Sequence, residues 1–466
     1  MPLNLINKSH LALVLLLAAA MPVVFADIAP DQLQKLPPPQ PGDSIETLHA
    51  KAARAEALQD HERVVDCWTM VTKRTPGDES AWLSLANAFE HLEGGNRNEN
   101  EDKAFAAYAE AIRLKPEDAG AWNLRGEAYY RTGKEDKASA DFSEAIRLDP
   151  ALAVGYRNRA YIELENAGSD KAIADLTMAI RFTKQESDLA GLYQRRGQAF
   201  ADNGDNGKAV ADFSQVIRIF ADSDDEGESF DAYLSRANAL REEGENDKAI
   251  ADYSRAIRIG GGQDTYTAYN GCGEAYAATD RRDKAIADFK AALRSSANAD
   301  SSMDLAFAYY SGGEYDKAIA VCNDAIKNYD DLFAAFHDLK GAAHAAKGEA
   351  KLAALDYQQA VDAAAKACGE TQWADARYIE TLAAAESRVG KFDVAAKHQQ
   401  MLIGLCREKS RQESGASLVG SSRALPAAQI LAGGQTAVNF DPGCRRAIGG
   451  GFLKRNGVIH EQLIMN

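Results

Sequence analysis

One pattern recurs ten times between Ala52 and Ala395. Each unit has a small residue, an aromatic or aliphatic residue three places later, a short polar turn, and then usually an alanine. In nine of the ten units the small residue and the residue at the alanine place are twelve positions apart, and the remaining unit, Ala86 to Ala104, carries six extra residues in the turn. A period of about 34 residues that is built from paired helices is typical of a solenoid, in which neighbouring repeats bury a continuous core.

The most complete unit runs from Ala119 to Pro150 and resembles the tetratricopeptide repeat. It has the following residues at the spacing of that family: Trp122, Gly126, Tyr129, Ala138, Phe142, Ala145 and Pro150. The resemblance covers about three quarters of the chain, so residues 45–406 are expected to form the solenoid. It implies an all-α fold, a right-handed superhelical solenoid of about ten antiparallel helix pairs, in which the motif residues pack the helices and none is catalytic.

The composition excludes two classes of protein. Hydrophobic residues make up 46% of the chain and charged residues 26%, which excludes disorder over most of its length. The formal net charge is −16 at pH 7, whereas phosphate binding needs clustered Lys and Arg. We therefore expect no nucleic acid as a partner, and a protein or peptide partner that is basic or neutral.

The N-terminus has the features of a secretory signal peptide. Lys8 precedes an apolar run from Leu11 to Val24, and Ala26 ends a short segment that fits a cleavage site, so residues 1–26 are predicted to be the signal and residues 27–44 a Pro-rich linker. We expect a secreted or periplasmic protein with no stable membrane span after cleavage. The alternative is an uncleaved N-terminal membrane anchor, although about fourteen apolar residues are few for a span, which needs about twenty.

Six cysteines have irregular spacing and divide into two groups. Cys67, Cys272 and Cys322 fall at repeat positions that face the helix interior, where cysteine is usually a small hydrophobic residue. The other three lie near the last repeat and the tail, and they are the candidates for a disulfide: Cys368, Cys406 and Cys444. The chain has no CxxC and no HExxH sequence, so we expect no metal site and no cofactor.

A pair of charged positions recurs with the repeat. In four middle units the residue just before the small residue, at the seventh place of the unit, is an arginine. A position on the facing helix of the same units is an aspartate. The pairs are Arg125 with Asp141, Arg159 with Asp175, Arg196 with Asp212, and Arg236 with Asp252. A fifth pair is Lys340 with Asp356. Where the first member is apolar, the second is apolar too or changes character, as in Leu85 with Ala107, Leu305 with Val321, and Leu382 with His398. Because a half-buried charge is costly unless it is paired, this co-variation predicts ion pairs within repeats. Asp288, which faces Cys272, must find another donor or water.

In tetratricopeptide proteins the first helices line the concave face, which holds extended peptides. The corresponding places in this chain are rich in amides, which offer both a donor and an acceptor to a peptide backbone. We take these as candidate peptide-binding residues: Asn87, Asn123, Glu127, Arg157, Gln194, Gln198, Asn238, Asn270 and Glu274. The alternative is that they are simply solvated. The basic carboxylate clamp of chaperone-docking repeats is not matched here, because no consecutive set of these places supplies the cations.

The end of the array differs from its middle. The last unit, Trp373 to Leu405, has polar residues from Lys397 to Gln400 where inner repeats are apolar, as expected of a capping repeat. Residues 407–466 form a Gly- and Ser-rich tail with eight Lys or Arg against four Asp or Glu. Basic residues flank three consecutive glycines there, but no strand and helix frame them, so a phosphate loop is weakly indicated. We expect this tail to be partly disordered or docked on the array.

These observations favour a non-catalytic protein–protein interaction scaffold of the cell envelope, which binds extended polypeptide segments on the concave face. The alternative is an adaptor or regulatory subunit that delivers substrates to an envelope enzyme. We do not expect an enzyme, because the tail has one His and one Cys and no recognisable set of nucleophile, base and orienting group.

Overall fold

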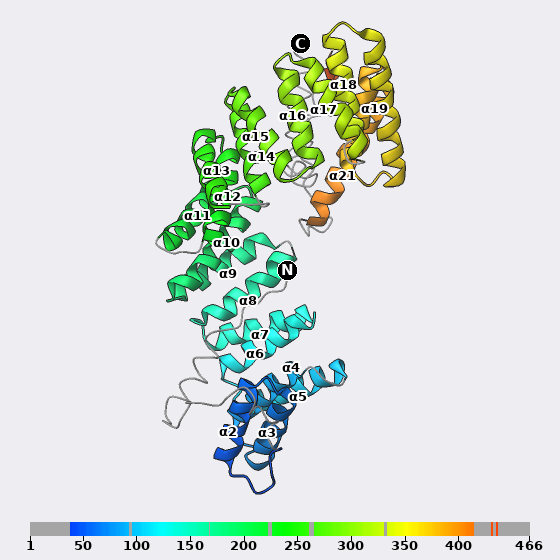
Figure 1. The fold of residues 1–466 in the computed structure, drawn as a ribbon. Coiled ribbons are helices and arrows are strands. Elements are labelled where there is room, and N and C mark those ends of the chain that lie inside the picture. Colours follow the sequence, from blue (N-terminus) through cyan, green and yellow to red (C-terminus); the bar gives the residue numbers. More distant parts are fainter. Residues whose placement is uncertain are drawn as a thin grey trace. The chain divides into compact units, whose positions relative to one another are not determined.

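The computed structural model describes residues 38–92, 96–166, 168–221, 226–260, 265–329, 333–413, 430–431 and 435–436 (Figure 1). The predicted signal peptide, most of the linker and nearly all of the tail lie outside these residues. The chain divides into two compact units, residues 1–150 and 151–466, which are described separately. No helix among the described residues is long and apolar enough to span a membrane.

Both units consist of helix pairs, each with a first and a second helix. Unit 1 has three pairs: α2 (Ile45–Ala57) with α3 (His61–Arg74), α4 (Glu79–Glu90) with α5 (Arg97–Leu114), and α6 (Ala119–Arg131) with α7 (Glu135–Leu148). Unit 2 begins with α8 (Ala153–Glu165), α9 (Ser169–Phe182), α10 (Glu186–Asp202), α11 (Asn206–Phe220), α12 (Glu226–Glu242), α13 (Asn246–Gly260), α14 (Tyr266–Ala278) and α15 (Arg282–Ser295). It continues with α16 (Ala299–Ser311), α17 (Tyr315–Asn328), α18 (Phe333–Ala346), α19 (Ala350–Glu370), α20 (Ala376–Arg388) and α21 (Phe392–Glu413).

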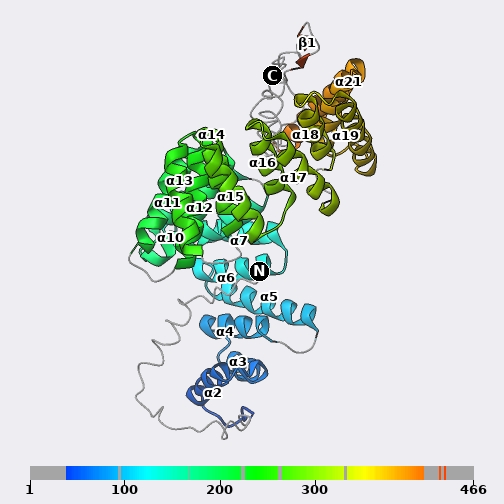
Figure 2. The same cartoon turned by 45° about the horizontal axis from the view of Figure 1, so that its top comes forward.

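Within each unit every helix packs against the next one in the chain, and in unit 2 the first helices from α10 to α20 also contact one another in succession. Figure 2 shows α10 to α15 lying side by side in this way. The predicted all-α fold of about ten helix pairs is confirmed in the described residues. The tail adds one short antiparallel pair, β1 (Ile430–Leu431) and β2 (Gln435–Thr436), in which Ile430 lies opposite Thr436.

Local sequence explains where the helices begin. The side chain of Asp118 accepts hydrogen bonds from two backbone N–H groups in the first turn of α6, groups that have no partner inside the helix. The indole Nε1 of Trp122 donates to the carbonyl of Pro116 at 3.0 Å, which holds the incoming chain against the helix. Asp78 and Trp82 make the equivalent bonds at the start of α4.

The turn between the two helices of a pair needs a left-handed residue. After α6, Gly133 has φ +72°, and the backbone N–H of Lys134 then donates to the carbonyl of Tyr129 at 2.9 Å. Glycine takes this conformation without the penalty that a Cβ would add. Five later turns have glycine in the same conformation, at Gly204, Gly244, Gly313, Gly348 and Gly390.

The small residue of each first helix sits against a ring of the second helix. A Cβ atom on Gly197 would lie 2.8 Å from Cε1 of Phe213, a ring that is 1% exposed and therefore has no space to move into. The same geometry holds for Gly126 with Phe142 and for Gly273 with Phe289. The repeated small residue is therefore explained by packing alone.

The sequence predicts that the six extra residues of the second repeat all lie in the turn, but the structure places some of them in a helix. The second helix of that repeat, α5, has 18 residues, whereas α7 in the next repeat has 14. The insertion thus adds one turn of helix before Ala104, and the remaining extra residues lie between the end of α4 at Glu90 and the start of α5 at Arg97.

The cysteines agree with the expected interior positions. Cys67, Cys272 and Cys322 are buried without a disulfide. Cys368 is likewise a buried free thiol, while the side chain of Cys406 and all of Cys444 lie outside the described residues. A bridge between the last two cysteines therefore stays a hypothesis from sequence.

Candidate functional site

The predicted ion pairs within repeats are confirmed. In each of the four arginine repeats, Nε and Nη2 of the guanidinium donate to the two carboxylate oxygens of the aspartate at 2.7 to 2.9 Å. The side chains of Asp141, Asp175, Asp212 and Asp252 are between 6% and 10% exposed. A bidentate pair of this kind satisfies a carboxylate that would otherwise be buried alone.

Two of these arginines also reach the preceding repeat. Nη1 of Arg196 donates to Oγ1 of Thr177 at 3.1 Å, and Nη1 of Arg236 donates to Oγ of Ser214 at 3.0 Å. Thr177 and Ser214 lie on the second helices of the preceding pairs. Each guanidinium therefore holds three helices together and fixes how one repeat stacks on the next.

In two other repeats the aspartate at this position is paired with groups other than an arginine. Asp356 accepts from Lys340 at 3.0 Å and contacts Nδ1 of His344 at 2.6 Å. Asp288 has the thiol of Cys272 as its donor, and burial raises the pKa of Asp288 although that hydrogen bond opposes the shift. The prediction that Asp288 needs a donor other than Cys272 is therefore wrong, because the thiol of Cys272 itself is the donor.

His398 corrects the expected polar cap of the last repeat. Its side chain is only 17% exposed, and Nδ1 lies 2.7 Å from Oε2 of Glu386, whose side chain is 7% exposed. Trp373 stacks on the imidazole with the ring centres 5.1 Å apart. The polar neighbours of His398 predict a side chain that faces solvent, but in the structure it packs between α20 and α21.

The candidate peptide-binding residues divide between the units. Asn87, Asn123 and Glu127 belong to unit 1, and the other six belong to unit 2. Asn87 is exposed, whereas Asn123 is buried and its Nδ2 donates to Oε1 of Glu127 at 2.9 Å. The amide of Asn123 is therefore engaged inside its own helix.

In unit 2 the candidates are partly engaged as well. Gln198 is exposed, and its Nε2 donates to Asp202 at 2.8 Å within the same helix. Asn238 is exposed and accepts from the buried hydroxyl of Tyr253 at 2.6 Å. Arg157 is half-buried, and its Nε lies 3.4 Å from the amide oxygen of the neighbouring Asn158.

Three further bonds join the first helices of unit 2 into one polar row. Gln194 on α10 donates to Ser235 on α12 at 3.1 Å, Arg241 on α12 pairs with Glu274 on α14, and Asn270 on α14 donates to Asp304 on α16 at 3.1 Å. Sequence reasoning missed Ser235, Arg241 and Asp304. Each lies close to one repeat period from its partner, which is the signal that could have identified them.

Family models decide what kind of protein this is. A tetratricopeptide repeat model matches residues 119–152, and a second tetratricopeptide repeat model matches residues 195–264 and 273–333. The chain is a tetratricopeptide repeat protein. None of the proteins with curated descriptions matches it.

Solved structures with a similar fold are distant from this tetratricopeptide repeat protein in sequence. YrrB, a TPR protein with an unusual peptide-binding site, is 18% identical, with coverage of 41% of this chain and 92% of its own and a TM-score of 0.36. The C-terminal part of a TPR repeat-containing protein from Cytophaga hutchinsonii is 16% identical, with coverage of 53% and 94% and a TM-score of 0.43. A tetratricopeptide repeat protein from Parabacteroides merdae is 16% identical, with coverage of 59% and 98% and a TM-score of 0.37.

Glu380 lies on α20, the first helix of the last pair, and its carboxyl group is not fully paired in the described part of the chain. Burial raises the pKa of Glu380 on α20 to about 8, and its Oε2 has no hydrogen-bond partner in the described part of the chain. Two turns further along α20, Nε of Arg388 lies 2.7 Å from Oδ1 of Asp338 on α18. The charges of Arg388 and Asp338 therefore balance each other, whereas the carboxyl group of Glu380 is not balanced in this way.

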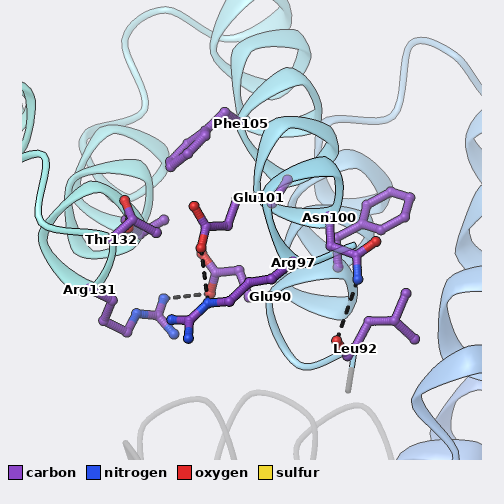
Figure 3. Close-up of a pocket in the computed structure, with 11 residues that line it drawn as sticks. Glu90, Leu92, Arg97, Asn100, Glu101, Phe105, Arg131 and Thr132 are labelled. Atoms are coloured by element: carbon purple, nitrogen blue, oxygen red, sulfur yellow. Dashed lines mark hydrogen bonds and ion pairs between the residues drawn. The ribbon is translucent and has the colours of Figure 1, made fainter. Parts of the chain in front are cut away.

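Unit 1 also contains a pocket that the sequence did not predict. It lies between the end of α4, the first turns of α5 and the end of α6, with a volume of about 140 Å³ (Figure 3). Glu90, Arg97, Glu101 and Arg131 provide its charged groups. The insertion in the second repeat was the available signal, but it did not show which side chains would meet.

Proposed function

We propose that this protein is a non-catalytic scaffold that binds extended polypeptide segments on the first-helix face of unit 2, the face that carries the polar row from Gln194 to Asp304. Tetratricopeptide repeats support a role in protein interaction. The observation that carries the finer proposal is the row itself, because amide, hydroxyl and carboxylate groups follow one another across α10, α12, α14 and α16.

The chemistry of the row suits a peptide backbone with a basic or neutral character. A backbone offers one N–H and one C=O for each residue, and amides can pair with both. Glu274 and Asp304 lie in the same row as the amides, and the net charge of the chain is −16. An acidic surface raises the local concentration of cationic segments, while contacts to the backbone hold them with little demand on sequence.

The envelope location is part of this proposal and rests on the signal-like N-terminus. An adaptor that delivers substrates to an envelope enzyme would use the same face, so the two functions differ in the partner and not in the site. Affinity capture from the envelope fraction with the full chain, followed by identification of the bound proteins, separates them. An enzyme that co-purifies in a fixed ratio would favour the adaptor.

Removing exposed polar groups from the first-helix face should weaken binding of the captured partner. We expect Gln198→Ala with Asp202→Ala to raise the dissociation constant about tenfold, which corresponds to the loss of one or two hydrogen bonds. These two residues bond to each other at 2.8 Å, so their removal leaves no buried group unpaired. Titration calorimetry with the purified partner measures the change.

The second helix α19 offers a matched control. Gln358 donates to Asp362 at 2.8 Å with the same spacing of four residues. Gln358→Ala with Asp362→Ala should leave the affinity unchanged. Equal losses in both double variants, or no loss in either, would contradict the proposed face.

A further inference from the structure

The pocket of unit 1 exists because the second repeat is longer than the others. The first turn of α5, which the 14-residue helix α7 lacks, carries Arg97 into the pocket wall, and Glu101 follows directly after this turn. Phe89 from α4 and Phe105 from α5 form apolar parts of the wall. Figure 3 shows Glu90 and Glu101 on the same side of the pocket as the two arginines, with Phe105 across from them.

Glu90 is the group in this pocket whose hydrogen bonding is incomplete. Its side chain is 9% exposed, and the carboxylate pairs with Nη2 of Arg131 through Oε2. The other oxygen, Oε1, is buried and has no hydrogen-bond partner in the described part of the chain. Burial raises the pKa of Glu90, while Arg131 and the hydroxyl of Tyr108 lower it. A carboxylate with unfilled acceptor positions can take a further N–H donor from a ligand.

The charges around the cavity indicate a neutral ligand. Glu90 and Glu101 contribute two negative charges, and Arg97 and Arg131 contribute two positive charges. Arg97 pairs with Glu101 at 3.1 Å and is 82% exposed, and Arg131 is 51% exposed, so both guanidinium groups have donors facing solvent. A charged ligand would leave an unbalanced charge in a partly enclosed site, whereas a group with one donor and one acceptor would not.

We propose that this pocket binds a primary carboxamide on a short aliphatic stem, such as the side chain of a glutamine in a polypeptide partner. The amide N–H donates to the carboxylate of Glu90, and the amide oxygen accepts from Arg131 or Arg97. The stem packs between Phe89 and Phe105. The assignment of the ligand to a protein partner rests on the proposed function, but the pocket itself does not.

Three small probes of similar shape test the pocket in the full chain. Butyramide has a donor and an acceptor, butyrate has only acceptors, and butylammonium has only donors. We expect saturation-transfer difference NMR to show butyramide binding with a dissociation constant on the order of millimolar, as a ligand of this size allows. Butyrate and butylammonium should bind at least ten times more weakly. Equal binding of either ion would overturn the proposal, and so would the absence of binding by all three probes, which would mean a hydrated cavity only.

Variants locate the binding. Glu90→Met removes the acceptor with little change in volume, and Thr132→Leu fills the pocket while Glu90 remains. Both should weaken butyramide binding about tenfold or more. Glu56→Met is the matched control, because Glu56 occupies the same repeat position on α2 and does not line the pocket. Butyramide binding that survives both pocket variants would place the probe elsewhere and contradict the proposal. Intact butyramide binding together with a partner affinity that Gln198→Ala with Asp202→Ala leaves unchanged would instead count against the proposed function alone.

Discussion

Replacing Arg196 by Leu should lower the stability of unit 2 by about 3 to 5 kcal/mol, the usual cost of removing one partner of a buried ion pair. The variant leaves the carboxylate of Asp212, which is 6% exposed, without either of its donors. It also removes the hydrogen bond to Thr177 on the preceding repeat. Urea unfolding followed by circular dichroism measures the change in the transition midpoint.

The chain supplies its own compensating pair. Leu85 with Ala107 occupies these two places in the second repeat, and both residues are buried there. Arg196→Leu combined with Asp212→Ala should therefore recover most of the lost stability. Lys208→Ala, which breaks an exposed pair with Asp205, should cost less than about 1 kcal/mol. A double variant as unstable as the sum of its single variants would contradict the account of paired burial.

Glu380→Gln should stabilise the protein at neutral and alkaline pH. The pKa of Glu380 is about 8 in the folded chain and lies near 4.5 in the unfolded chain, so the folded state binds the proton more tightly. Stability should therefore fall as pH rises from about 4.5 to 8, by about 1.4 kcal/mol for each pKa unit of difference, several kcal/mol in total. The Gln variant lacks this titration and should be the more stable form above pH 8.

Thermal unfolding between pH 4 and 9 tests the prediction. Glu370→Gln is the control, because Glu370 is an exposed carboxylate at the end of the neighbouring helix α19. Its pH profile should match that of the unchanged protein. Parallel profiles for the unchanged protein and Glu380→Gln would show that Glu380 is ionised in the folded chain at low cost, and that its surroundings are more polar than the structure indicates.

The fold was predictable because the same contact between two helices recurs in many repeats. Gly197 against Phe213 and Gly126 against Phe142 need the same spacing, so a regular pattern appears in the sequence. The ion pairs were predictable for a related reason. Two repeat positions that are both charged in some repeats and both apolar in others are expected to lie in contact.

The candidate site was less predictable. Its residues were placed on the correct helices, but the bonds of Gln194 and Asn270 to the next repeat depend on how repeats stack, which a pattern within one repeat does not contain. The burial of Glu380 and of His398 likewise depends on neighbouring helices. The position of the insertion in the second repeat was visible, but the helical turn that it adds to α5 was not.

Site-specific photo-crosslinking in cells tests the central claim most directly. A photoreactive residue in place of Gln198, on a first helix, should crosslink to a polypeptide partner, and the crosslinked peptide should be an extended basic or neutral segment. The same residue in place of Gln358, on the second helix α19, should give no such product. Crosslinks from position 358 with none from position 198 would contradict polypeptide binding on the first-helix face.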